Sequence, residues 1–302
     1  MKKFLFKTSL LIIVMFSIFL FIETIVLSSN NNQMTFKNSL LKKQGVEVII
    51  LGNSHSFYGI NPSVSDYKMI NVANKGRKLE TDYLILKQNI NILPDIKSII
   101  IPISHYTLLA DKVLQKEKRL YYNYFNLKSY DQGFLNNNLI FNEPFRELID
   151  NSIFGSRDNH DLKISDLGWR TTSRTYKKNI TRIKDRINAM EGTYKEGNKI
   201  INKNIKYLDS ISQLSRTYNK KIFFLTPPYH PDYYQYSNII YHQKIKTIIN
   251  NFTDEENVYL INGKELNITE NIFFEDIDHL NLKGARLFTK KIDSILKSTF
   301  NH

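Results

Sequence analysis

The sequence predicts an α/β protein, a three-layer α/β/α sandwich with a mainly parallel sheet, preceded by an N-terminal transmembrane helix. Three observations predict this fold. A long apolar run follows a lysine-rich start, short β-branched runs recur along the chain, and stretches with apolar residues at helical spacing separate them. Strands that alternate with helices are typical of a parallel sheet covered on both faces.

The N-terminus carries a candidate membrane anchor. Residues 8–27 are almost wholly apolar and follow Lys2, Lys3 and Lys7. At about 1.5 Å per residue, a helix of this length spans a bilayer core of roughly 30 Å. Glu23 is the only charge in the run and lies near its far end, where burial costs less than at mid-membrane.

The flanking lysines favour a cytoplasmic N-terminus, which places the rest of the chain outside the cytoplasm. A cleaved signal peptide is the alternative. The apolar run is long for a signal peptide, and the residues that follow it offer no clear Ala-x-Ala cleavage site. We therefore expect a single-pass protein of the cell membrane with an extracytoplasmic domain.

Composition divides the chain into regions. Residues 1–27 form a cytoplasmic stub and the anchor, and the polar residues 28–44, rich in Asn and Lys, predict a linker. A globular domain is expected over residues 45–302. Within it, residues 110–198 are rich in Tyr, Arg, Lys and Asn and hold Trp169. We expect a helical insertion there, which either shapes a substrate cleft or covers one edge of the sheet.

Hydrophobic patterns place the elements of the domain in order. Short β-branched or aromatic runs predict buried strands at residues 46–52, 96–104, 221–228 and 257–262. Apolar residues at helical spacing predict helices at residues 79–92, 201–218 and 282–296. Sheets of this kind carry their functional groups at the carboxyl ends of the strands.

Composition also excludes several classes of function. The chain has no cysteine, which rules out disulfides, cysteine nucleophiles, thiolate zinc sites and iron–sulfur clusters. No phosphate-loop, dinucleotide or zinc-protease motif is present, so we expect neither a metal nor a cofactor.

The net charge of +13 allows anionic partners. The predicted topology places this charge outside the cytoplasm, so nucleic acid is not an expected partner. The basic stretch 170–186 predicts a solvated face. If it binds anything, an anionic polymer or lipid head group outside the cell is the better hypothesis.

Ser54 is a candidate nucleophile because of its position after a strand. The first buried strand ends at Gly52, and Ser54 follows almost at once. Glycine permits a sharp turn that lifts the serine above the sheet edge. Backbone N–H groups after the strand can then face a developing oxyanion. The alternative is an ordinary Gly-Asn-Ser turn with no chemistry.

A late acidic segment supplies a candidate base. Asp276 and His279 lie three residues apart, immediately before the last predicted helix. A serine hydroxyl needs an adjacent base, and imidazole suits that role near neutral pH. A carboxylate fixes the imidazole tautomer and stabilises the imidazolium. The alternative is that Asp276 and Asp278 merely favour a helix start and that His279 is a polar surface residue.

Together these two segments resemble the SGNH/GDSL hydrolase superfamily, in which a Gly-Asp-Ser turn carries the nucleophile and a late Asp-x-x-His carries the acid and base. Here Asn53 stands in place of the usual Asp of the turn. Residues 71–76, Asn-Val-Ala-Asn-Lys-Gly, resemble the family's second block. The resemblance implies that the backbone N–H groups of Ser54 and Gly76 hold the oxyanion. It covers roughly residue 46 to the C-terminus, with 110–198 unaligned.

The third family block departs from the pattern. It normally brings Gly-x-Asn-Asp, whose Asn donates to the oxyanion, but the strand here ends Ile-Pro-Ile-Ser104-His105. Either Ser104 or His105 donates to the oxyanion instead, or only the backbone N–H groups of Ser54 and Gly76 hold it. The loss of one such donor raises the barrier of a typical enzyme by about 2.7–4 kcal/mol.

Three further residues lie near the expected site. Tyr229 and His230 follow two prolines after the third strand and either line a glycan or acyl pocket or belong to a stiffened loop. His55 adjoins Ser54, and the geometry of the turn predicts that it points away from the serine.

Two functions are compatible with the sequence. The chain resembles, more loosely, membrane-anchored branches of the superfamily that handle acyl groups on envelope polymers, namely alginate acetylation proteins and the protein of D-alanyl transfer to teichoic acid. The first hypothesis is an extracytoplasmic serine-dependent acyl esterase or O-acyltransferase that acts on an acylated glycan or another envelope acyl ester, with Ser54, His279 and Asp276 as its catalytic residues.

The second hypothesis is a non-catalytic SGNH-like binding or assembly protein. It would serve a membrane-bound acyltransferase partner or a glycan export system. The distance between the side chains of Ser54 and His279 discriminates between the two hypotheses, because a separation within about 3.5 Å favours the enzyme.

Overall fold

The computed structural model describes residues 1–29, 33–93, 95–110, 112–144, 164–170, 172–192, 198–254 and 256–301. Their contacts divide the chain into two compact units. The helical unit takes residues 1–36 and 114–161, and the α/β unit takes residues 37–113 and 162–302. All of the candidate site residues lie in the α/β unit.

The helical unit contains the long N-terminal helix α1 (Lys2–Ser29). Its segment Lys2–Ile25 is long and apolar enough to cross a membrane, as a signal sequence also would be. Glu23 is buried, and its carboxylate accepts hydrogen bonds from the N–H groups of Leu139 (2.7 Å) and Ile140 (3.0 Å). These are the first residues of α8, so the acid satisfies N–H groups that a helix start leaves without partners. The shorter helices of this unit are α6 (Gln115–Phe125), α7 (Phe134–Asn137) and α8 (Leu139–Asn142).

The segment predicted to be a linker is partly helical. Helix α2 (Gln33–Leu40) lies within residues 28–44. Lys37 and Leu40 are fully buried in the α/β unit. The polar composition of the segment hid this short helix, because few of its residues face the core.

The α/β unit is built on a parallel five-stranded sheet with the order β2-β1-β3-β4-β5. The strands are β1 (Val48–Ile50), β2 (Met69–Asn71), β3 (Ser98–Pro102), β4 (Lys221–Thr226) and β5 (Val258–Asn262). The predicted fold class is confirmed, and β2 is the strand that the hydrophobic pattern missed. Strand β1 pairs with both β2 and β3, so the winding direction of the chain reverses beside it. Such a switch point leaves a crevice at the carboxyl ends of the strands.

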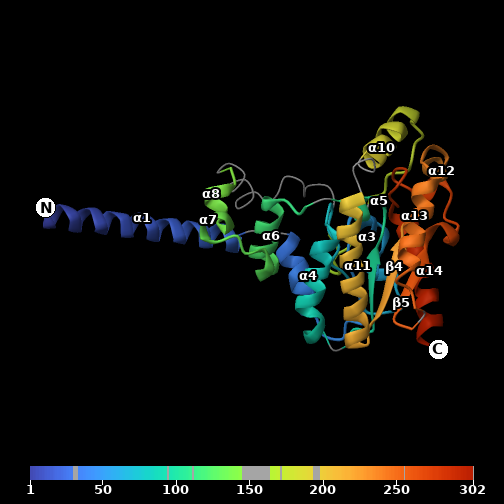
Figure 1. The fold of residues 1–302 in the computed structure, drawn as a ribbon, viewed down its shortest axis with the longest axis horizontal. Helices are drawn as coiled ribbons and strands as arrows, with labels where there is room; N and C mark the ends of the chain where they lie inside the picture. The colour runs from blue at the N-terminus through green and yellow to red at the C-terminus, as the bar shows by residue number, and fades with distance from the viewer. Residues whose placement is uncertain are drawn as a thin grey trace. The chain divides into compact units, whose positions relative to one another are not determined.

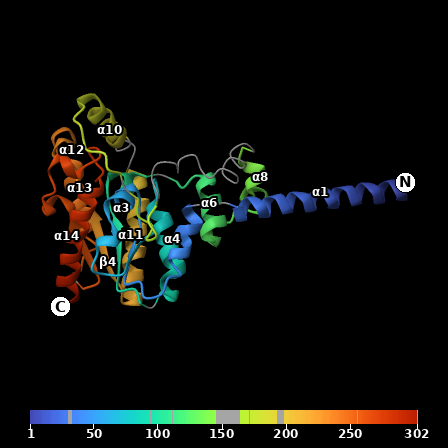
Figure 2. The same ribbon diagram turned by 180° about the vertical axis from the view of Figure 1, so that it is seen from behind.

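Helices cover both faces of the sheet. Helix α14 (Leu282–Phe300) lies on one side of β4, and the neighbouring helices α4 (Leu79–Asn89) and α11 (Asn198–Tyr218) lie on the other (Figures 1 and 2). Burial on both faces explains why the strands are continuous apolar runs instead of alternating ones.

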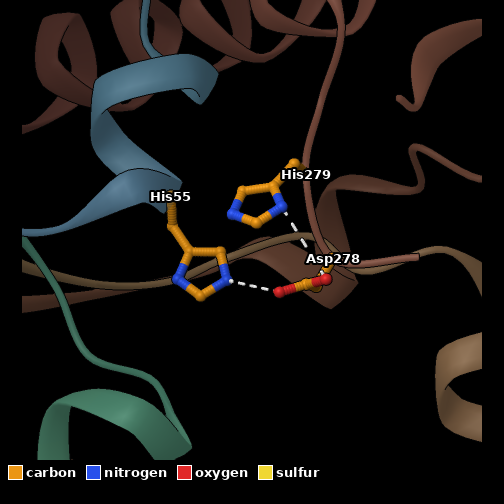
Figure 3. Close-up of side chains that lie close together, drawn as sticks. All are labelled: His55, Asp278 and His279. Carbon is orange, nitrogen blue, oxygen red and sulfur yellow. Dashed lines mark ion pairs between the residues drawn. The ribbon is translucent and has the colours of Figure 1, made fainter. Parts of the chain in front are cut away.

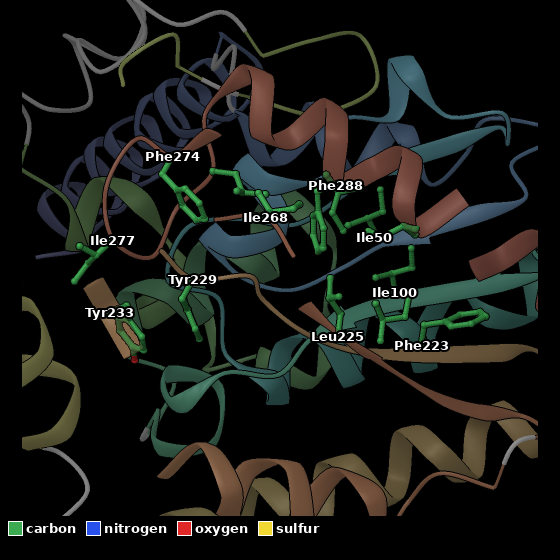
Figure 4. Close-up of a cluster of buried hydrophobic side chains, with 14 of the residues drawn as sticks. Ile50, Ile100, Phe223, Leu225, Tyr229, Tyr233, Ile268, Phe274, Ile277 and Phe288 are labelled. Carbon is green, nitrogen blue, oxygen red and sulfur yellow. The ribbon is translucent and has the colours of Figure 1, made fainter. Parts of the chain in front are cut away.

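One core cluster shows how the side chains meet. Ile50, Ile100 and Phe223 occupy neighbouring positions on adjacent strands, and Phe288 of α14 packs into the same cluster (Figure 4). All four side chains are buried. The remaining helices of the unit are α3 (Ser54–Gly59), α5 (His105–Leu109), α10 (Ile180–Gly192), α12 (Pro231–Tyr236) and α13 (Ile239–Asn250). Short 3-10 turns occupy Pro62–Val64, Ile90–Ile92, Lys128–Tyr130, Gly263–Leu266 and Asn271–Phe273.

Part of the predicted insertion covers the edge strand of the sheet. The carbonyl of Leu167 accepts a hydrogen bond of 2.7 Å from the N–H of Asn71 in β2. A Cβ at Gly168 would lie 2.1 Å from the Asn71 carbonyl oxygen, so only glycine permits this close approach. The indole Nε1 of Trp169 donates to the Tyr58 carbonyl at 3.0 Å. These contacts agree with the edge-covering alternative for residues 167–169.

Candidate active site

The turn after β1 places Ser54 at the switch point. Gly52 has φ +101°, and a Cβ there would lie 2.1 Å from Cδ of Pro102, so the turn requires glycine. Asn53 caps α3, because its Oδ1 accepts a hydrogen bond of 3.1 Å from the N–H of His55. Ser54 is therefore the first residue of a short helix that begins at the carboxyl end of the sheet.

A buried acid on α4 supports this turn. Asp82 accepts a hydrogen bond of 3.0 Å from the N–H of Gly52, and Nη1 of Arg77 lies 3.4 Å from the same carboxylate. Burial raises the pKa of Asp82 to about 6, although the charge of Arg77 opposes the rise. Asp82 thus holds the backbone of the turn that carries the serine.

The structure brings Ser54, His279 and Asp276 together. Nε2 of His279 lies 2.9 Å from Oγ of Ser54, across 225 positions of sequence. Nδ1 of His279 lies 3.0 Å from Oδ2 and 3.1 Å from Oδ1 of Asp276. Oδ1 of Asp276 also accepts from the N–H groups of Asp278 (2.9 Å) and His279 (2.7 Å). The geometry is that of a serine, a base and an orienting acid, while the catalytic roles remain predictions.

A second carboxylate, which the sequence reasoning missed, lies beside the imidazole. The Asp278 side chain is fully buried and lies 3.7 Å from Nδ1 of His279 (Figure 3). Arg186 donates to both of its oxygens, from Nη2 at 2.7 Å and from Nε at 3.2 Å. The Arg186 side chain is nevertheless 46% exposed, so the prediction of a solvated face over residues 170–186 is wrong for the buried Arg170 and not for Arg186. No local sequence pattern predicts the pairing of Arg186 with Asp278, because the two residues are 92 positions apart.

These charges set the protonation of the base. Burial alone would lower the pKa of His279, but the negative charge of Asp278 and the hydrogen bond with Asp276 outweigh it and raise the pKa to about 9. Burial would in turn raise the pKa of Asp278, but the charges of His279 and Arg186 hold it well below its ordinary value. The imidazolium of His279 and the carboxylate of Asp278 thus stabilise each other's charged forms.

His55 belongs to the same cluster. Its ring stacks on that of His279 at 5.2 Å between centroids, and its Nδ1 lies 3.2 Å from Oδ1 of Asn53. As predicted, none of its described contacts is with the Ser54 side chain. Burial lowers the pKa of His55, although Asp278 opposes the effect, so burial favours the neutral ring.

The cluster also resembles a metal site in its spacing. Ligand atoms of His55, Asp278 and His279 lie within 4.8 Å of one another. Nε2 of His55 is buried without a hydrogen bond, which would suit a metal ligand. However, Arg186 occupies both oxygens of Asp278, and its positive charge opposes a cation at this position. The arrangement fits an ion-pair network better than a metal centre.

The two predicted oxyanion donors follow β1 and β2, the neighbouring strands of the sheet. The N–H of Ser54 is the first of α3, where no helical carbonyl lies four residues back to accept it. Gly76 has φ +67° in the turn after β2, and its carbonyl accepts a hydrogen bond of 2.8 Å from the hydroxyl of Tyr106. The roles of both N–H groups stay predictions.

The segment after β3 supports the serine turn indirectly. Ser104 is buried and caps α5, because its Oγ accepts from the N–H of Thr107 at 3.3 Å. Oγ1 of Thr107 accepts in turn from Nδ2 of Asn53 at 3.2 Å. His105 is the first residue of α5, and its side chain lies outside the described part of the structure. Substrate contact by Ser104 or His105 remains a prediction.

The two residues after the Pro-Pro pair differ in their surroundings. Tyr229 contacts the His55 ring edge-on at 5.7 Å and lines, with Ser104, a cavity of about 510 Å³. Nε2 of His230 lies 2.7 Å from Oδ1 of Asn271, and none of its described contacts involves the serine, imidazole or carboxylate above. Tyr229 thus borders the cluster. Binding of substrate by either residue stays a prediction.

Comparison with known proteins adds little to this geometry. No family model and no curated protein matches the sequence. A solved structure from Streptococcus pneumonia, described as a "putative platelet activating factor", is similar at 13% identity and a TM-score of 0.43, over 91% of this chain and 96% of that chain. This similarity is too distant to transfer a function, so the functional argument depends on the residues of this chain.

Proposed function

We propose that the protein is an extracytoplasmic serine-dependent acyl esterase or O-acyltransferase that acts on a cell-envelope or exported polysaccharide. One observation carries the proposal, namely the 2.9 Å between Oγ of Ser54 and Nε2 of His279. A distance within about 3.5 Å supports an enzyme over a binding protein. The acylated glycan is the substrate class implied by the family resemblance.

The geometry supports acyl transfer through a covalent intermediate. Neutral His279 accepts the proton of the Ser54 hydroxyl while Oγ attacks the ester carbonyl carbon. The N–H groups of Ser54 and Gly76 stabilise the oxyanion, and the C–O bond to the leaving alcohol breaks as His279 returns the proton to that oxygen. The acyl group then passes to water in an esterase, or to a sugar hydroxyl in an O-acyltransferase.

Asp276 is the orienting acid in this scheme. Its contacts with Nδ1 of His279 turn Nε2 toward the serine. The N–H groups of Asp278 and His279 also donate to the Asp276 carboxylate and hold it in this orientation. An acid that is itself fixed can select one tautomer of the base.

We also propose that α1 anchors the domain at the outer side of the cell membrane. Its apolar length and the lysines at its start support this topology. Fusion of a reporter to the C-terminus provides the test. Activity of a reporter that works only outside the cytoplasm is expected, and activity of one that works only in the cytoplasm would contradict the orientation.

A second candidate is a non-catalytic assembly protein for a membrane-bound acyltransferase. It is favoured by one observation, the absence of an Asn after β3 where the resembled family has an oxyanion donor. The direct contact of Ser54 with His279 favours the enzyme instead.

Fluorophosphonate labelling of the full chain in uncharged detergent distinguishes the serine-dependent enzyme from the non-catalytic assembly protein. We expect labelling and turnover of p-nitrophenyl acetate in the wild type, loss of both in Ser54→Ala, and retention in Ser56→Ala, a buried serine of the same helix. Equal turnover in the wild type and Ser54→Ala removes the nucleophile. Addition of an oligosaccharide then distinguishes transfer, which yields an acylated sugar, from hydrolysis.

A further inference from the structure

The short helices α7 and α8 pack against α1 within the helical unit. The rings of Phe19 and Phe141 stack with their centroids 4.3 Å apart. Those of Phe16 and Phe134 lie 6.1 Å apart. Figure 1 shows α7 and α8 beside the C-terminal half of α1. Their contacts are therefore with the apolar segment Lys2–Ile25, which is long and apolar enough to cross a membrane.

A buried acid joins the same two parts of the unit. The carboxylate of Glu23 accepts hydrogen bonds from the N–H groups of Leu139 and Ile140, and Leu27 packs against the cluster of Tyr124 and Leu139. A charge in apolar surroundings is costly unless it is hydrogen-bonded. These bonds explain how α1 can carry an acid inside its apolar run. Removal of α1 as a signal peptide would take this acceptor away from α8.

The two short helices also expose large apolar side chains. Phe134 and Phe141 are each 53% exposed, and Leu135 is 66% exposed. Single exposed apolar residues are normal on a protein surface, but a group of them marks a contact with a membrane or another protein. The contacts of Phe16 with Phe134 and of Phe19 with Phe141 make this group continuous with the apolar surface of α1.

The asparagines between these apolar residues bond within the protein. Nδ2 of Asn137 donates to the Asp131 carboxylate at 2.6 Å, and Nδ2 of Asn142 donates to the Leu135 carbonyl at 2.6 Å. Nδ2 of Asn136 donates to a backbone carbonyl four residues earlier at 3.1 Å. Lipid acyl chains offer no hydrogen-bond partners, so polar groups beside them must be satisfied by the protein itself. The segment meets this requirement despite its polar residues.

The position of the contacts along α1 gives their depth. At about 1.5 Å per residue, Phe16 lies about 16 Å from Leu27, the last residue of the apolar run, which is roughly half of a bilayer core of about 30 Å. The contacts of α7 and α8 thus fall on the C-terminal half of the apolar run. In the proposed topology this half lies in the outer leaflet.

We propose that α7 and α8 form a second membrane contact, in which Phe134, Leu135 and Phe141 insert among the acyl chains of the outer leaflet beside α1. This placement rests on the proposed topology and goes beyond anchoring by α1 alone. Lipid is the occupant because the ring contacts hold these side chains against the part of α1 that lies in the bilayer. A second contact also prevents the helical unit from rotating freely about α1.

Single cysteines can probe this contact directly, because the chain has none of its own. Leu135→Cys tests the inserted surface, and Ile13→Cys, at an exposed position of α1, reports on the anchor. Ser129→Cys is the control in water, a nearly isosteric change at an exposed position of the polar turn Lys128–Tyr130. Each full-length variant is labelled with bimane and reconstituted in phosphatidylcholine vesicles. The quenchers are a nitroxide on the lipid acyl chain and iodide on both sides of the membrane.

We expect the acyl-chain nitroxide to lower the fluorescence at positions 13 and 135 about twofold or more, since interfacial elements lie about 5–10 Å into the boundary of head groups and acyl chains. Iodide should quench only position 129. Lipid quenching at 13 but not at 135 would overturn the proposal. Iodide quenching at 135 would then mean exposure to water, and protection from both quenchers would mean cover by a second copy of the chain.

The same measurement separates this proposal from the proposed function. Absence of lipid quenching at position 13 would contradict the anchor, and the second contact with it, whereas a failure at position 135 alone leaves the anchor intact. Fluorescence quenching requires no catalysis. A failure of Ser54 as the nucleophile is therefore seen only in fluorophosphonate labelling and does not alter the result.

Discussion

The carboxylate of Asp278 lies 3.7 Å from Nδ1 of His279, although Asp276 makes the hydrogen bonds to that nitrogen. The two acids differ in their exposure, since the Asp278 side chain is fully buried and that of Asp276 is 49% exposed. A charge acts more strongly where water is excluded. We infer that Asp276 orients the imidazole and Asp278 mainly stabilises its charged form.

The protonation of His279 predicts the pH dependence of activity. The base must be neutral to accept the serine proton, and its pKa is raised to about 9. We therefore expect kcat/KM for p-nitrophenyl acetate to rise with pH and to level off above about pH 9. Asp278→Asn should move the midpoint downward, because it removes the negative charge that opposes deprotonation. An identical profile for both proteins, flat above pH 7, would contradict this assignment.

The two carboxylates should differ when each is replaced by an amide. In Asp276→Asn we expect kcat to fall by about 10²–10⁴-fold, because the amide no longer selects the correct tautomer. The free energy of unfolding should change little, since this side chain is half-exposed. Steady-state kinetics and urea unfolding of the same preparation check the two parts. A stability loss that accounts for the missing activity would argue against an orienting role.

Asp278→Asn should mainly affect stability. It leaves the Arg186 guanidinium without its carboxylate, and we expect a loss of about 1–3 kcal/mol in the free energy of unfolding. Arg186 is partly exposed, which keeps the loss below that of a fully buried pair. Arg186→Met in the same background provides the control, because removal of both partners should restore part of the loss. Additive losses in the double variant would show that the pair is not coupled.

The sequence was sufficient for four of the five strands and for the three contacting residues of the site. Residues 46–52 and 221–228 are apolar on both faces, which is the pattern of a covered parallel sheet. Gly52 and Ser54 are two residues apart, so their turn can be predicted from the local sequence. Asp276 and His279 are three residues apart and contact each other within one loop. Each of these signals lies within a few residues.

The missed features depend on contacts between distant segments. Strand β2 has three residues, too few to show a period. The pairing of Asp278 with Arg186 joins residues far apart in sequence, and nothing local distinguishes Arg186 from a solvated arginine. Helix α2 could not be recognised from its sequence, because the segment is polar and only a few of its residues are buried, among them Lys37 and Leu40.

Gly52 should tolerate no side chain. A Cβ there would lie 2.1 Å and 2.3 Å from ring carbons of Pro102, and φ is +101°. We expect Gly52→Ala to cost about 1–3 kcal/mol from the steric overlap, in addition to the cost of positive φ, and to abolish fluorophosphonate labelling. Gly133→Ala is the matched control, because its φ is +82° but nothing lies within 4 Å of the added Cβ. Similar losses of stability in both variants would show that overlap is unimportant.

Lys37 predicts a pH-dependent difference in stability. The side chain is fully buried, donates to the carbonyl of Ala73 and lies 4.0 Å from the ring centroid of Phe57. Burial, followed by the charge of Arg77, lowers its pKa well below 10.5. The pKa of Lys37 in the unfolded chain is the ordinary 10.5. Between this pH and the lower pKa of the folded protein, the lysine is protonated only in the unfolded chain, so the free energy of unfolding falls as pH falls until the folded pKa is reached.

Lys37→Met removes this titration and keeps a side chain of similar length. We expect the stability of the variant relative to the wild type to increase as pH is lowered, by up to about 1.4 kcal/mol per pH unit between the two pKa values. Urea unfolding at several pH values in uncharged detergent measures it. Lys184→Met, at an exposed position, should leave the pH dependence unchanged. Parallel curves for the wild type and Lys37→Met would mean that Lys37 titrates alike in the folded and unfolded chains, so the difference between the curves decides whether this amine is neutral inside the protein.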